Sequence, residues 1–171
     1  MPRTLDTGVL ENAQDAPAIV HDAVVSVESS AWLRLYFDKV NLPAGGILRL
    51  TSARDGDVQE LNAAELVMWN NTSAYFNGDT VTLELLAAPG TRDNRVVLRE
   101  VATQIVTQRG PCAGDDCGIC GSDDRVPSAE LWSGRLMPVG CTASVYNTSS
   151  CVVSAGHCAS SGLVIQFSPQ P

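Results

Sequence analysis

The sequence predicts an all-β protein, and three observations support this class. Apolar and polar residues alternate in several short segments, turn-forming residues separate these segments, and only one short segment has a helical pattern. Short strands at this spacing are typical of antiparallel sandwiches and jelly rolls. We therefore expect an antiparallel β-sandwich or jelly roll over residues 29–107, a cysteine-rich linker over 108–125, and further strands over 126–171.

The alternation is clearest in four segments of the predicted sandwich. These segments are WLRLYF at 32–37, ILRLT at 47–51, TVTLELL at 80–86 and NRVVLREV at 94–101. Glycine with proline, asparagine or aspartate fills the gaps between them, and these residues favour tight turns. The helical pattern is AAELVMW at 63–69. Residues 1–28 are polar and acidic, so we expect a leader or loosely ordered arm there, in which residues 23–27 are a candidate strand.

Composition excludes some classes of function. The net charge of −8 argues against nucleic acid as a partner, because phosphates attract basic surfaces. No apolar run approaches the roughly 20 residues of a membrane span, and the first 20 residues contain no signal-peptide apolar segment.

All six cysteines lie between Cys112 and Cys158. An even, clustered set is typical of a disulfide framework, so we expect a secreted protein; reduced thiols in the cytosol are the alternative.

The cysteine spacing also imitates metal sites. Cys112, Cys117 and Cys120, followed by Cys151, have the spacing of plant-type ferredoxin ligands. Cys151, however, lies in a strand-forming segment rather than in a small cluster-binding fold. Cysteines together with His157 offer the ligand types of a zinc site. We expect neither, and therefore predict no cofactor and no metal.

The segment CVVSAGHC at 151–158 has the pattern of a candidate catalytic histidine. A strand that ends in a turn of small residues can present an imidazole at its end, and Ala155 and Gly156 leave room for the ring of His157. A histidine that acts as a general base needs such a fixed ring. The alternative is that His157 has only a structural role at the end of this apolar run.

The longer segment GCTASVYNTSSCVVSAGHC at 140–158 resembles the trypsin-like (chymotrypsin-fold) serine proteases. The residues before it, DDRVPSAELWSGRLMPVG at 123–140, are similar to those of secreted bacterial members, including glutamyl-endopeptidase-like enzymes. The resemblance implies that residues 126–171 begin a trypsin-like β-barrel. It also implies that His157 is the general base and that a Cys141–Cys158 disulfide clamps its loop.

The chain departs from the family pattern after the histidine. No Asp or Glu follows His157, and no G-D-S-G nucleophile segment is present. The family triad runs His, Asp, Ser along the chain. The resemblance therefore implies a truncated catalytic domain, inactive alone, whose partners are a protein or peptide substrate and the C-terminal remainder of the domain.

The resemblance raises two further expectations. Cys151 stands where many relatives carry a large apolar residue, and we expect it to pair with Cys112, Cys117 or Cys120, while the other two close a small loop. Sequence alone does not settle this connectivity. Arg125-Val126 is a candidate activation site, because cleavage there would free the Val126 amine, although Pro127 departs from the usual glycines.

The predicted sandwich has a resemblance of its own. Trp32-Leu33-Arg34, Leu42-Pro43-Ala44-Gly45 and Gly78-Asp79-Thr80-Val81 are similar to segments of the β-sandwich pro-regions of bacterial lysyl-endopeptidase-like precursors. This implies an accessory or pro-domain. The sequence thus favours the N-terminal part of a secreted serine endopeptidase. The alternative is a non-catalytic secreted β-sandwich binding module with a degenerate protease-like tail.

Overall fold

The computed structural model describes residues 2–105 and 130–167. Contacts divide the chain into two compact units, Met1–Val106 and Thr107–Pro171, called here the sandwich unit and the histidine unit. Strands account for 53% and helices for 6% of the structure, which confirms the predicted all-β class. No helix among the described residues is long and apolar enough to cross a membrane.

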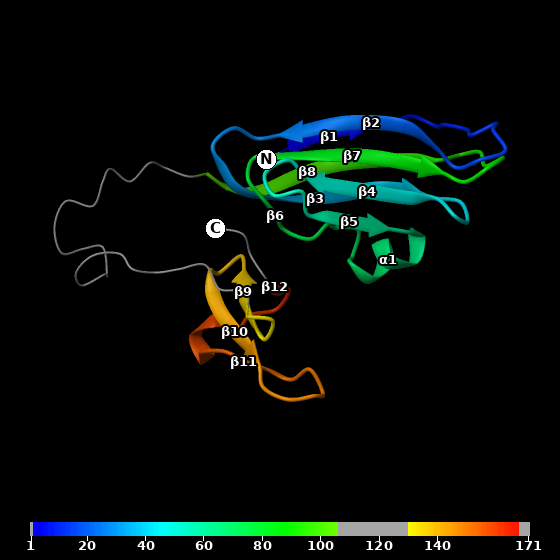
Figure 1. Cartoon of the computed structure of the whole chain (residues 1–171). Coiled ribbons are helices and arrows are strands. Elements are labelled where there is room, and N and C mark those ends of the chain that lie inside the picture. Colours follow the sequence, from blue (N-terminus) through cyan, green and yellow to red (C-terminus); the bar gives the residue numbers. More distant parts are fainter. Residues whose placement is uncertain (1, 106–129, 168–171) are drawn as a thin grey trace. The chain divides into compact units, whose positions relative to one another are not determined.

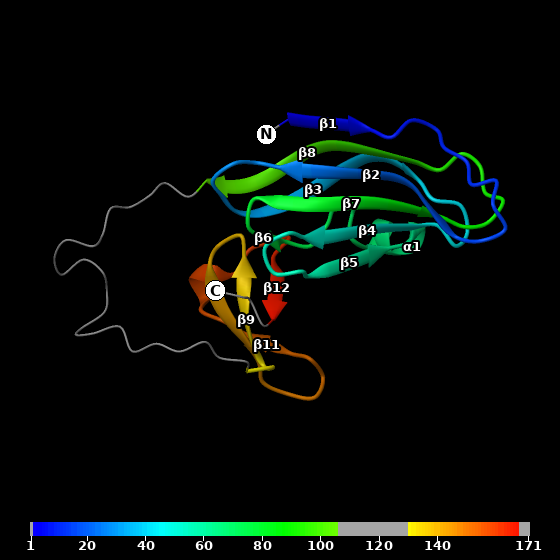
Figure 2. The same cartoon turned by 45° about the horizontal axis from the view of Figure 1, so that its top comes forward.

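The sandwich unit contains two four-stranded antiparallel sheets (Figure 1). The first has the order β1-β8-β3-β6, and its strands are Pro2–Asp6 (β1), Arg95–Ile105 (β8), Ser30–Asn41 (β3) and Phe76–Asn77 (β6). The second has the order β2-β7-β4-β5, with Ala18–Ser26 (β2), Thr80–Ala87 (β7), Ile47–Ser52 (β4) and Val58–Leu61 (β5). Figure 2 shows β7 between β2 and β4.

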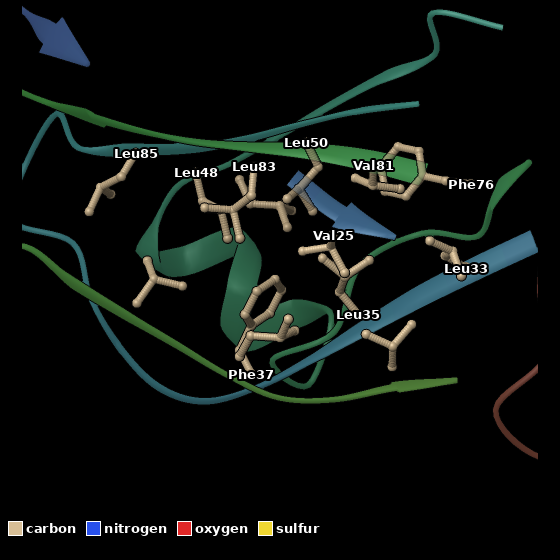
Figure 3. Packing of buried hydrophobic residues seen from close by; sticks show 14 of the residues in the cluster. Val25, Leu33, Leu35, Phe37, Leu48, Leu50, Phe76, Val81, Leu83 and Leu85 are labelled. Atoms are coloured by element: carbon tan, nitrogen blue, oxygen red, sulfur yellow. The ribbon is translucent and has the colours of Figure 1, made fainter. Parts of the chain in front are cut away.

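One apolar core joins the two sheets. Every second residue of β7 is buried, so Val81, Leu83 and Leu85 point inward and are fully inaccessible to solvent. Leu35 and Phe37 of β3 meet them from the other sheet, as Figure 3 shows. Period-two alternation places one face of each strand toward this core, which is the physical basis of the predicted sandwich.

The segment 1–28 differs from its prediction as an arm, because it contains β1 and β2. β2 pairs with β7 from Ala18 to Ser26, and β1 pairs with β8. The strand expected at 23–27 overlaps the second half of β2, while the sequence pattern hides the first half because a bulge between Ile19 and His21 shifts the alternation. Its exposed residues are Ile19, Asp22 and Val24, so apolar side chains lie on both faces and the pattern of a half-buried strand is weak.

The predicted helix is α1, Ala63–Met68. Asn62 caps it: its side-chain oxygen accepts hydrogen bonds from the backbone N–H groups of Ala64 and Glu65, at 2.9 and 3.0 Å. The Glu65 carboxylate in turn accepts the N–H of Asn62 at 2.8 Å, which completes a capping box. Leu66 anchors this short helix in the core.

The histidine unit is an open antiparallel sheet in the order β11-β10-β9-β12. Its strands are Ser133–Met137 (β9), Cys141–Val145 (β10), Val152–Val153 (β11) and Val164–Phe167 (β12). A single turn of 3-10 helix, Gly156–Cys158, follows β11. The described strands form no closed barrel.

Candidate functional site

A β-hairpin leads to the candidate histidine. Val145 pairs with Val152 and Ser144 with Val153, so β10 and β11 run side by side. In the turn between them, the Asn147 side-chain oxygen accepts the backbone N–H groups of Ser149 and Cys151, at 3.1 and 2.9 Å. Asparagine is suited to this role because its side chain imitates a backbone turn. The hairpin therefore returns the chain toward the start of β10.

His157 lies at the centre of the 3-10 turn that follows β11. The N–H of Cys158 donates to the carbonyl of Ala155 at 2.9 Å, and the N–H of Ala159 donates to the carbonyl of Gly156 at 3.2 Å. These bonds fix the backbone on both sides of the histidine. The predicted tight turn of small residues at the strand end is confirmed.

The Cys141–Cys158 disulfide closes this loop. It joins the first residue of β10 to the residue after His157, across a Cα–Cα distance of 6.2 Å. Cys158 is 4% exposed and packs with Leu136 and Ala143 in a small apolar core. Because its sulfur is enclosed, the bond holds one end of the histidine turn inside the unit, and the predicted pairing is confirmed.

Ser154 provides a second anchor. Its hydroxyl donates a hydrogen bond to the carbonyl of Thr142 at 2.7 Å, next to Cys141 on β10. The histidine turn is thus tied to β10 on both sides of the ring, by Ser154 before it and by Cys158 after it. The sequence pattern does not reveal this bond, since it depends on the hairpin register.

Gly134 supports the small core from β9. A β-carbon at this position would lie 2.6 Å from Cγ2 of Ile165 and 2.9 Å from the carbonyl oxygen of Gln166. Glycine therefore allows β12 to approach β9 closely. This approach brings Leu163 and Ile165 against the core that contains Cys158.

The imidazole of His157 is exposed to solvent. Within the described part of the chain, it forms no hydrogen bond or ion pair, so no described carboxylate holds its tautomer. A ring nitrogen of His157 and the sulfurs of Cys141 and Cys158 lie within 4.8 Å of one another. In the disulfide state both sulfurs are bonded to each other, which leaves the imidazole as the one free ligand of the three.

Cys151 lies at the end of the hairpin turn, and its side chain is exposed. Within the described part of the chain it has no disulfide partner. Its pairing with the linker stays a prediction. The other residues of those predictions, Cys112, Cys117, Cys120, Arg125 and Val126, lie outside the described residues.

Trp32 and Arg34 have a structural role on the outer face of β3, while Leu33 between them belongs to the core. The ring of Trp32 meets Tyr75 edge-on at 4.9 Å. The Arg34 guanidinium lies 4.8 Å from the centre of the Tyr75 ring and donates to the Ser73 carbonyl and the Thr72 hydroxyl. These contacts make Trp32 and Arg34 packing elements, since Trp32 and Tyr75 are both buried.

Comparison of the chain with protein-family models, with curated proteins and with solved structures gives no match.

Proposed function

We propose that this chain is the N-terminal part of a secreted serine endopeptidase in which His157 is the general base. The observation that carries the proposal is an exposed imidazole on a turn held by Ser154 before it and by the Cys141–Cys158 disulfide after it. A general base must be accessible to its partner and fixed in position. This arrangement exposes the imidazole and holds the backbone on both sides of it, while orientation of the ring itself would need a carboxylate.

The reaction would be hydrolysis of a peptide bond in a protein or peptide substrate. An imidazole nitrogen takes the proton of a serine hydroxyl as that oxygen attacks the carbonyl carbon, and then gives the proton to the leaving amine. A carboxylate holds the imidazole in the correct tautomer. Because no Asp or Glu follows His157 in this chain, a further segment would supply both the acid and the serine. We expect the chain alone to be inactive.

The sandwich unit would serve as an accessory or pro-domain. This role is supported by an apolar core that belongs to the sandwich unit and is separate from the small core that contains Cys158. A unit with its own core can assist folding or restrain the enzyme without contributing to the chemistry.

One observation favours a second candidate, a non-catalytic secreted β-sandwich with a degenerate protease-like tail. Among the described residues no carboxylate contacts His157, while the sandwich unit contains the larger core. In that case the histidine turn would be a structural remnant, and the sandwich unit would bind a partner.

A fluorophosphonate probe separates the two candidates. It would be applied to the product of the full reading frame that contains this chain. We expect covalent labelling of one serine, and we expect H157A to abolish it. The matched control is H21A, at the other histidine of the chain, which should leave labelling unchanged. Absence of labelling in the wild-type product, or equal labelling of H157A, would favour the binding module.

A further inference from the structure

We propose that reduction of the Cys141–Cys158 disulfide creates a metal site formed by both cysteine sulfurs and the imidazole of His157, suited to Zn²⁺. The three ligand atoms already lie within 4.8 Å of one another. Two thiolates and an imidazole are typical ligands of tetrahedral zinc. The proposal goes beyond protease function, because metal affinity needs these three side chains and no serine.

The distances require little movement. Zinc binds sulfur at about 2.3 Å and nitrogen at about 2.0 Å, so tetrahedral ligands lie roughly 3.5–3.8 Å apart. The two sulfurs must move apart from bonding distance. The imidazole nitrogen, which lies within 4.8 Å of both sulfurs, must reach the spacing of tetrahedral ligands. Side-chain rotations can supply these shifts, since the Cα atoms of Cys141 and Cys158 stand 6.2 Å apart.

Other contacts hold the ligands together once the disulfide is broken. The Ser154 hydroxyl still ties the histidine turn to Thr142, the neighbour of Cys141. Cys141 remains paired with Leu136 in the sheet, and Cys158 remains in the small core. The two thiols are therefore kept near each other without the covalent bond.

A trialkylphosphine can reduce the Cys141–Cys158 disulfide. Two electrons from the phosphine, together with two protons, cleave the sulfur–sulfur bond to give two thiols, and the phosphine becomes its oxide with an oxygen from water. Binding of Zn²⁺ then releases one proton from each thiol, while neutral His157 donates a nitrogen lone pair. His157 is exposed, so water can take the fourth position.

The test uses Co²⁺ as a spectroscopic probe of the full chain. A background variant with C112S, C117S, C120S and C151S removes the other thiols, so that only Cys141 and Cys158 remain. After phosphine reduction and removal of oxygen, Co²⁺ should produce thiolate-to-metal charge transfer and the visible bands of tetrahedral cobalt. Added Zn²⁺ should displace the colour. The oxidised protein should remain colourless.

Two variants of this background test the role of the imidazole. H157A should weaken Co²⁺ binding by about tenfold or more, because losing a direct ligand costs at least as much as losing its outer-shell support. H21A, the matched control, should bind as the background does. Absence of charge transfer in the reduced chain would overturn the proposal. So would equal affinity and an identical spectrum for H157A, since the thiols would then bind the metal without the histidine.

Discussion

Asp6 and Arg95 form a two-point ion pair that ties β1 to β8. The guanidinium donates to the two carboxylate oxygens of Asp6 at 3.0 and 2.5 Å. Asp6 also accepts the backbone N–H of Gly8 at 2.9 Å. The pair fixes β1, an edge strand that the sequence pattern does not reveal. Its contribution to stability can be tested by varying the pH.

The pKa of Asp6 is lowered from 3.8 to about 2, first by the hydrogen bonds from Arg95 and then by that from Gly8. A depressed pKa stabilises the fold above the unfolded value and loses this contribution as pH falls through the folded value. We therefore expect the stability difference between wild type and D6N to shrink between about pH 4 and about pH 2. Urea unfolding across this range measures it. A difference that stays constant across this range would contradict the ion pair between Asp6 and Arg95.

Val81 and Val24 provide a matched test of the sandwich core. They lie on paired strands, and their exposed fractions are 0% and 66%. V81A should lower the free energy of unfolding by about 2 kcal/mol, because it removes buried methyl groups and leaves a cavity. V24A should change it by about 0.5 kcal/mol or less. Chemical denaturation of the full chain measures both changes. Equal effects would contradict the observed burial, in which Val81 faces the core and Val24 faces solvent.

Gly134 should not tolerate alanine. The added β-carbon would press on Ile165 and on the backbone of Gln166, so G134A should destabilise the histidine unit by about 1–3 kcal/mol. Gly156 is the matched control, because a β-carbon there meets nothing within 4 Å. Amide hydrogen exchange along β9 and β12 reports the change. Normal protection of these strands in G134A would show that they do not approach as closely as described.

Ser154 should position the histidine turn through its hydroxyl. S154A removes the bond to the Thr142 carbonyl and should cost about 1 kcal/mol. The amides of Cys158 and Ala159, which close the turn, should then exchange faster with solvent. S154T keeps a hydroxyl and should restore protection. If S154A and S154T behave alike, the hydroxyl does not hold the turn.

The sequence by itself determined the all-β class and the central strands, whereas the Cys141–Cys158 pairing was implied by a family resemblance. Strands such as β7 alternate without interruption, so Val81, Leu83 and Leu85 indicate their own buried face. The disulfide followed from a family resemblance in the cysteine–histidine spacing, and the structure contains it. Local patterns of this kind need no knowledge of distant residues.

Tertiary structure decided what depends on partners far along the chain. β2 becomes a strand because β7 pairs with it across a bulge, although its own alternation is broken at Ile19–His21. Ser154 becomes an anchor only because the hairpin brings Thr142 opposite it. In each case the deciding energy comes from a contact that no local pattern encodes, so it emerges only when the strands have assembled.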